Sequence, residues 1–211
     1  HTLYGGDWEN RLKQEIILGI GGIRLLSELN IQSDIYHCNE GHAALINVQR
    51  LIDLLGKKLT FPEAFEIVKA TSLFTTHTPV PAGHDKFDED LVRVYLRHIP
   101  DQLTISWSEF MDLGREFPGQ AGDKFSMSVL AAKTSQEMNG VSWLHGEVSK
   151  KMFAHLWDGY APEELHINYV TNGVPYGTWT SADFQKVYAE TVDKDFLNAV
   201  SDKKHWAQIY D

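Results

Sequence analysis

Three short segments of the sequence carry side chains that could bind a hydroxylated ligand. These side chains are amides, imidazoles, a carboxylate and a hydroxyl, and they belong to Asn39, Glu40, His42, His77, Thr78 and Asn172. Together such groups both donate and accept hydrogen bonds, as the vicinal hydroxyls of a sugar do. A sugar ligand is therefore the first hypothesis, provided that the fold brings the three segments together.

Each of these residues also has a purely structural explanation. Asn39 and Asn172 could be turn residues, because asparagine tolerates left-handed backbone and Asn-Gly is a frequent turn pair. His77 could be a structural histidine whose ring bonds a backbone carbonyl. The residue pattern alone leaves both explanations open.

Other chemistries fit the sequence less well. The histidine spacings match no zinc pattern, and Cys38 is the single cysteine. A glycoside hydrolase needs two carboxylates flanking the bond, whereas only Glu40 follows a predicted strand, with Asp85 or Glu147 to supply a second. No Gly-x-Ser-x-Gly motif of a serine hydrolase is present in the sequence.

The periodicity of apolar residues predicts an α/β fold with a mainly parallel sheet. Extended segments are expected at residues 33–38, 72–77 and 166–171. Helical spacing is found at residues 8–29, 42–55, 62–70, 88–97, 106–114, 126–137 and 146–157. Strands that alternate with helices imply right-handed crossovers, with helices on both faces of the sheet. Since such sheets bind ligands at the carboxyl ends of their strands, the polar segments are expected to meet in one crevice.

The first predicted helix contains glycines at positions 19, 21 and 22. They imitate a dinucleotide-binding loop, but the run lies inside a helix and Arg24 occupies the place of the third glycine. Because glycine weakens a helix, these residues indicate a bend or a close approach of another backbone. Asp7 is well placed to cap the start of this helix.

Bulk composition describes one ordinary globular domain over residues 1–211. The 29 acidic residues outnumber the 19 basic ones, giving a formal charge of -10 that disfavours nucleic acid and anionic membranes as partners. The single cysteine and the lack of a long apolar run favour a cytoplasmic setting without a membrane span. The start at His1, without an initiator methionine or a signal segment, suggests an internal piece of a longer polypeptide.

Six strings occur in the order that is seen in α-glucan phosphorylases, and the chain resembles the bacterial branch of that family. The strings are LYGGD, NRLKQEIILGIGG, YHCNEGHAAL, FTTHTPVPAGHD, MNGVSWLHGEVSKKMF and YVTNGV. Glu40 stands where the animal enzymes have aspartate, which keeps a carboxylate at that position. The segment VPYGTW, which follows Asn172-Gly173, differs from the proline-arginine-arginine-tryptophan segment of the animal enzymes. It lacks the arginines of that segment, and with them the contacts that they make.

The resemblance implies part of the N-terminal, sugar-binding lobe of a two-lobed glycosyltransferase fold of the GT-B type. Such enzymes, glycogen and maltodextrin phosphorylases, cleave α-1,4-glucan with inorganic phosphate and release glucose 1-phosphate with retention of configuration. By match, His77 is the catalytic residue and holds the terminal glucose together with Asn172. The resemblance further assigns substrate binding in the adjacent channel to Asn39, Glu40, His42 and Thr78.

The resemblance also implies pyridoxal phosphate as cofactor. The lysine that binds it in the family lies in the C-terminal lobe, to which no segment of this chain corresponds, so the chain alone is expected to be inactive. The intact parent enzyme could form a homodimer. Two alternatives remain, a nucleotide-sugar-dependent glucan glycosyltransferase and a non-catalytic glucan-binding module.

Overall fold

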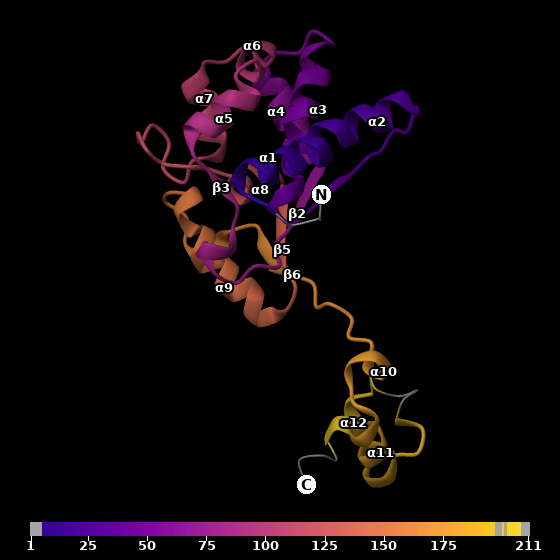
Figure 1. Ribbon diagram of the computed structural model, residues 1–211. Coiled ribbons are helices and arrows are strands. Elements are labelled where there is room, and N and C mark those ends of the chain that lie inside the picture. Colours follow the sequence, from indigo (N-terminus) through magenta and orange to yellow (C-terminus); the bar gives the residue numbers. More distant parts are fainter. Residues whose placement is uncertain (1–5, 197–199, 201, 208–211) are drawn as a thin grey trace. The chain divides into compact units, whose positions relative to one another are not determined.

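The chain forms two compact units, one ending at Thr171 and the other starting at Asn172 (Figure 1). A computed structural model describes residues 6–196, 200 and 202–207. That both belong to one domain over residues 1–211 stays a prediction.

A four-stranded parallel sheet is the centre of the first unit. Its strands, in spatial order, are β1 (Tyr36–Asn39), β2 (Ser72–Thr75), β5 (Glu137–Gly140) and β6 (Ile167–Tyr169). The three predicted strands are confirmed, although each is shorter than expected. The fourth, β5, was missed, because the helix predicted over residues 126–137 ends at Lys133 and is followed by a strand.

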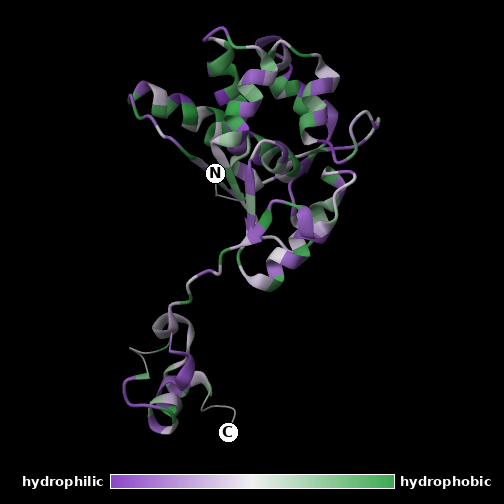
Figure 2. Ribbon diagram, turned by 180° about the vertical axis from the view of Figure 1, so that it is seen from behind, coloured by the Kyte–Doolittle hydropathy of each residue, from purple (hydrophilic) through white to green (hydrophobic). Residues whose placement is uncertain are grey.

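Helices form most of the rest of this unit and supply its core. They are α1 (Trp8–Ile16), α2 (Gly22–Glu28), α3 (Leu45–Leu55), α4 (Phe61–Ala70), α5 (Glu89–Leu96), α6 (Ile99–Leu103), α7 (Trp107–Gly114), α8 (Met127–Lys133) and α9 (Trp143–Phe153). Figure 2 shows apolar residues concentrated on the helices beside the sheet. Fully buried Leu45, Phe74 and Leu130 link α3, β2 and α8 into one core. A short antiparallel pair, β3 (Lys86–Phe87) with β4 (Phe125–Ser126), was not predicted.

The long first helix is interrupted where its glycines lie. A five-residue π-helical segment, Ile17–Gly21, separates α1 from α2. A Cβ atom added to Gly19 would lie 2.6 Å from the Cβ atom of Leu45, so the glycine lets α3 approach closely. The Asp7 side chain accepts a hydrogen bond from the Asn10 backbone N–H at 2.9 Å, which confirms the predicted cap.

The second unit is small and helical. It contains α10 (Tyr176–Trp179), α11 (Ala182–Thr191) and α12 (Lys203–Ala207). The ring of Phe196, which is 1% exposed, packs against Tyr188 and Trp206, with both centroid distances at 5.2 Å. An aromatic cluster is thus the packed centre of this unit.

Candidate functional site

The carboxyl ends of β1 and β2 bring four of the predicted site residues together. The two strands lie side by side with Asn39 opposite Thr75, so the residues that follow each strand share one edge of the sheet. His77 Nε2 lies 2.8 Å from Asn39 Oδ1. Thr78 Oγ1 donates a hydrogen bond to Glu40 Oε1 at 3.0 Å, and the backbone N–H of His77 donates to the same oxygen.

The backbone at Glu40 explains how one carboxylate reaches both loops. Its φ of 71° and ψ of 166° lie in a region that residues other than glycine rarely occupy. The next residue, Gly41, packs closely on α8, because an added Cβ atom would lie 2.6 Å from Ser128 Oγ. The other carboxylate oxygen of Glu40 accepts from the Gly41 N–H at 3.2 Å. Three donors therefore hold the Glu40 side chain in place.

A cavity of about 80 Å³ opens beside this group of residues. It is lined by Arg11, Glu40, Gly41, His42, Thr78, Gly83, His84, Asp85 and Ser128. Since about 10–15 Å³ of such space is enough to hold one water molecule, the cavity has room for a few ordered waters. Burial is the main cause that lowers the pKa of His42, so its imidazole is neutral at pH 7.

The structure adds residues that the sequence analysis did not assign to the site. His37 Nε2 lies 2.7 Å from Thr75 Oγ1, which donates to Asn139 Oδ1 at 2.8 Å. This chain of hydrogen bonds crosses from β1 through β2 to β5. Asn139 lies in the string MNGVSW, which carries the family resemblance, but the sequence patterns do not predict the strand that positions it.

The carboxylates considered for a hydrolase have other partners. Arg11 donates to Asp85 Oδ2 from Nε at 3.1 Å and from Nη2 at 2.7 Å. Glu147 accepts from Lys150 Nζ at 2.9 Å, within α9. Asp85 does line the cavity, but as one half of an ion pair with Arg11. Arg11 itself was not predicted as a site residue.

Asn172 begins the second unit. The structure does not place that unit relative to the first. Its predicted contact with the sugar held by His77 therefore stays a prediction.

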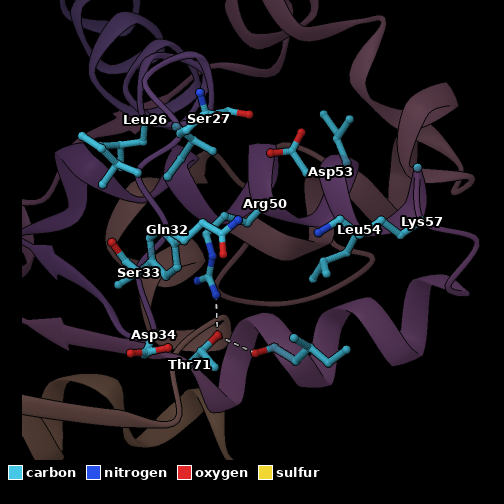
Figure 3. A pocket seen from close by; sticks show the side chains of 17 residues that line it. Leu26, Ser27, Gln32, Ser33, Asp34, Arg50, Asp53, Leu54, Lys57 and Thr71 are labelled. Atoms are coloured by element: carbon cyan, nitrogen blue, oxygen red, sulfur yellow. Dashed lines mark hydrogen bonds between the residues drawn. The ribbon is translucent and has the colours of Figure 1, made fainter.

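A larger hollow of about 800 Å³ lies elsewhere, near the amino ends of β1 and β2 (Figure 3). In it the Arg50 guanidinium hydrogen-bonds to Thr71 and stacks on the Tyr36 ring, 3.8 Å from its centroid. Its lining includes none of the predicted site residues. Because ligands of parallel α/β sheets bind at the carboxyl ends of the strands, we place the candidate site at the smaller cavity.

No group of three or more histidine, cysteine, aspartate or glutamate side chains in the described residues could hold a metal ion. None of the helices in that part of the chain has the length and apolarity that a membrane span requires.

A parallel α/β sheet with hydrogen-bonding side chains beyond the carboxyl ends of its strands is typical of proteins that bind small polar ligands. Comparison with known proteins narrows this class. The family model described as "Carbohydrate phosphorylase" matches residues 24–211. The chain belongs to this family of glycosyltransferases, which have the GT-B fold.

Several curated relatives support this membership. The chain is 43% identical over 189 residues to the maltodextrin phosphorylase of Thermococcus litoralis, covering 88% of this chain and 21% of the relative. It is 38% identical to the glycogen phosphorylase of Mycobacterium tuberculosis, covering 92% and 24%. For the glycogen phosphorylase of Aquifex aeolicus the identity is 32%, covering 99% and 30%. The chain thus spans between a fifth and a third of the length of these relatives.

Proposed function

We propose that this chain supplies the glucan-binding half of the active site of an α-glucan phosphorylase. The reaction is phosphorolysis, in which inorganic phosphate cleaves the terminal α-1,4 bond and glucose 1-phosphate is released. The observation that carries the proposal is the linked group of Asn39, Glu40, His77 and Thr78 beside the cavity, in a chain of this family. The names of the relatives, maltodextrin and glycogen phosphorylase, support a glucan as substrate, and we propose a cytoplasmic setting for the enzyme.

The geometry suggests how the residues divide the work. Asn39 and Glu40 hold the β2 loop from the side of β1, so the imidazole of His77 is fixed before substrate arrives. With Nε2 bonded to Asn39, the other ring nitrogen of His77 is left for a hydroxyl of the terminal glucose. A sugar held in this way as charge develops at its anomeric carbon is activated by positioning and electrostatic stabilisation. His42 would line the channel as a neutral hydrogen-bonding group.

Pyridoxal phosphate, which the family uses, does not fit this group of residues. The cavity lining contains no lysine that could bind the aldehyde of the cofactor. We therefore propose that the cofactor is held by other parts of the intact enzyme. Glucan binding is the task that we propose for the residues of this chain.

We expect His77→Ala, in a full-length enzyme that contains this chain, to lower kcat/KM for maltodextrin about ten- to hundredfold. The physical reason is the loss of one hydrogen bond to a buried sugar hydroxyl, worth roughly 1 to 3 kcal/mol. Steady-state phosphorolysis assays measure the effect, and the absorbance of the cofactor should stay unchanged. His98→Ala is the matched control, because His98 is exposed and lies outside the site.

Two results would contradict the proposal. Loss of cofactor in His77→Ala would mean that this histidine supports the cofactor and not the sugar. A full-length enzyme that binds maltodextrin but never produces glucose 1-phosphate would instead favour a non-catalytic glucan-binding module.

A further inference from the structure

A buried carboxyl group lies behind the cavity and takes no part in the mechanism above. Glu15, on α1, is 1% exposed. Its Oε1 atom lies 2.8 Å from Arg11 Nε, one helical turn earlier. Arg11 and its partner Asp85 both line the cavity, whereas Glu15 does not.

The hydrogen bonds of Arg11 to Asp85 leave the Glu15 carboxyl group short of hydrogen-bond donors. The Nε and Nη2 groups of Arg11 both donate to Asp85, and Nε also lies 2.8 Å from Glu15 Oε1, so Glu15 has to share this donor with Asp85. Neither oxygen of Glu15, both of them buried, has a hydrogen-bond donor of its own. A buried ionised carboxylate in that state is costly, whereas a protonated carboxyl can donate to a neighbouring acceptor. Asp85, whose carboxyl group contacts the same Arg11 guanidinium, is within hydrogen-bonding reach of Glu15 and is that acceptor.

Electrostatics favours the same protonation state. Burial, and then the charge of Asp85, raise the pKa of Glu15 to about 9, although Arg11 opposes the shift. At neutral pH Glu15 is therefore uncharged, and the charges of Arg11 and Asp85 cancel. The other ionisable side chains that line the cavity beside this pair are Glu40, His42 and His84.

We propose that Glu15 is a positioning residue whose carboxyl proton bridges to Asp85 and so holds the Arg11–Asp85 pair in the cavity wall. The pair then presents fixed donors and acceptors to the sugar that enters beside His42. The part of this inference that concerns glucan rests on the proposed function. The bridging proton itself depends only on the geometry of Arg11, Glu15 and Asp85.

The first experiment titrates Glu15 in the 211-residue chain. Glutamate labelled with ¹³C at the carboxyl carbon is followed by NMR from pH 4 to 10, and the resonance of Glu15 is the one that is missing in Glu15→Gln. We expect its midpoint at about 9. The exposed Glu63, whose pKa is lowered by hydrogen bonds from Thr60, is the internal control. A midpoint for Glu15 near the ordinary 4.5 would overturn the inference.

A second measurement tests positioning separately from protonation. The Nε–H of Arg11, assigned with Arg11→Lys, should exchange slowly with water in the wild-type chain. Glu15→Gln keeps a donor toward Asp85 and should keep this protection, whereas Glu15→Ala should lose it while the far-ultraviolet circular dichroism shows a folded chain. Equal protection in Glu15→Ala and the wild type would show that Glu15 does not position Arg11.

The third measurement connects the proton to the reaction in the full-length enzyme. The KM for maltodextrin should rise above pH 9 in the wild type as Glu15 ionises, and should stay flat in Glu15→Gln. At pH 7 Glu15→Ala should raise KM about three- to tenfold, the effect of one lost hydrogen bond, with little change in kcat. Were phosphorolysis itself absent, the proposed function would fail, and the two NMR measurements would still decide the role of Glu15.

Discussion

Glu40 is the residue on which the geometry of the site depends most. Its carboxylate accepts from the backbone N–H of His77, from Thr78 Oγ1 and from the N–H of Gly41. The same residue has a backbone conformation with φ of 71° that costs about 1 to 3 kcal/mol outside glycine. Glycine would remove the strain but also the three hydrogen bonds. We infer that the strain is tolerated because the carboxylate is needed at this point.

This strain can be measured by comparing two substitutions at position 40. Glu40→Ala and Glu40→Gly both lose the carboxylate, but only glycine accepts the left-handed backbone without strain. We expect the glycine variant to have the higher free energy of unfolding, by about 1 kcal/mol, in urea denaturation of the chain.

Position 66 supplies the matched control. Glu66 is exposed in the middle of α4. There the usual order should hold, with alanine about 1 kcal/mol more stable than glycine. If alanine were also the better residue at position 40, the backbone at Glu40 would be unstrained.

At the scale of elements, the π-helical segment Ile17–Gly21 packs closely on α3. Gly19 lies against Leu45, and an added Cβ atom would also come within 2.9 Å of the Leu45 backbone carbonyl carbon. Backbone atoms cannot move aside as a flexible side chain can. The same helical run carries Glu15 one turn and Arg11 two turns before Gly19, so this contact also helps to place the cavity wall.

We expect Gly19→Ala to lower the free energy of unfolding by about 1 to 3 kcal/mol, the usual cost of overpacking. Gly22→Ala should do the opposite, raising it by about 0.5 to 1 kcal/mol, because alanine is the better helix former. Gly22 is helical, and nothing lies within 4 Å of the place where its Cβ would be. Thermal unfolding of the two variants distinguishes packing from helix propensity, and equal effects would contradict the packing explanation.

The elements also show what sequence patterns could predict. The ends of β1 and β2 were predictable, since turn residues follow short apolar runs, and so was the meeting of Asn39 and His77 at one sheet edge. The strand β5 was not, because its four residues, Glu137–Gly140, begin only a few residues after α8 ends at Lys133 and include a polar Asn139. A strand this short shows no alternation of apolar and polar residues that would reveal it in the sequence.

Sequence patterns also could not predict which ionisable side chains are buried. Glu15 lies in a helical string of mixed charge, where an Arg–Glu pair at spacing four normally indicates an exposed face. It shares Arg11 with Asp85, which is 74 residues from Arg11 in sequence. Only the packing of the loop after β2 against α1 creates the cluster. Long-range contacts of this sort determine which charged residues form the site.

At the scale of the whole molecule, the apolar core belongs to the first unit. Its buried cluster extends in sequence from Leu12 to Ile167 and joins most of the helices to the sheet. The second unit, by contrast, has Phe196 as its buried hydrophobic residue among those described. Since a short unit buries a small share of its surface, it gains less hydrophobic stabilisation for each residue that it orders.

We therefore expect the second unit to unfold at a lower urea concentration than the first. Trp107 reports on the first unit, where its Nε1–H donates to Glu89 at 2.8 Å. Trp206 reports on the second, where its ring lies 5.2 Å from that of Phe196. In the chain labelled with 5-fluorotryptophan, and with the two signals assigned by Trp107→Phe and Trp206→Phe, the ¹⁹F resonance of Trp206 should reach its unfolded position first. Coincident midpoints would show one cooperative transition, and Asn172 would then belong to the same folding unit as His77.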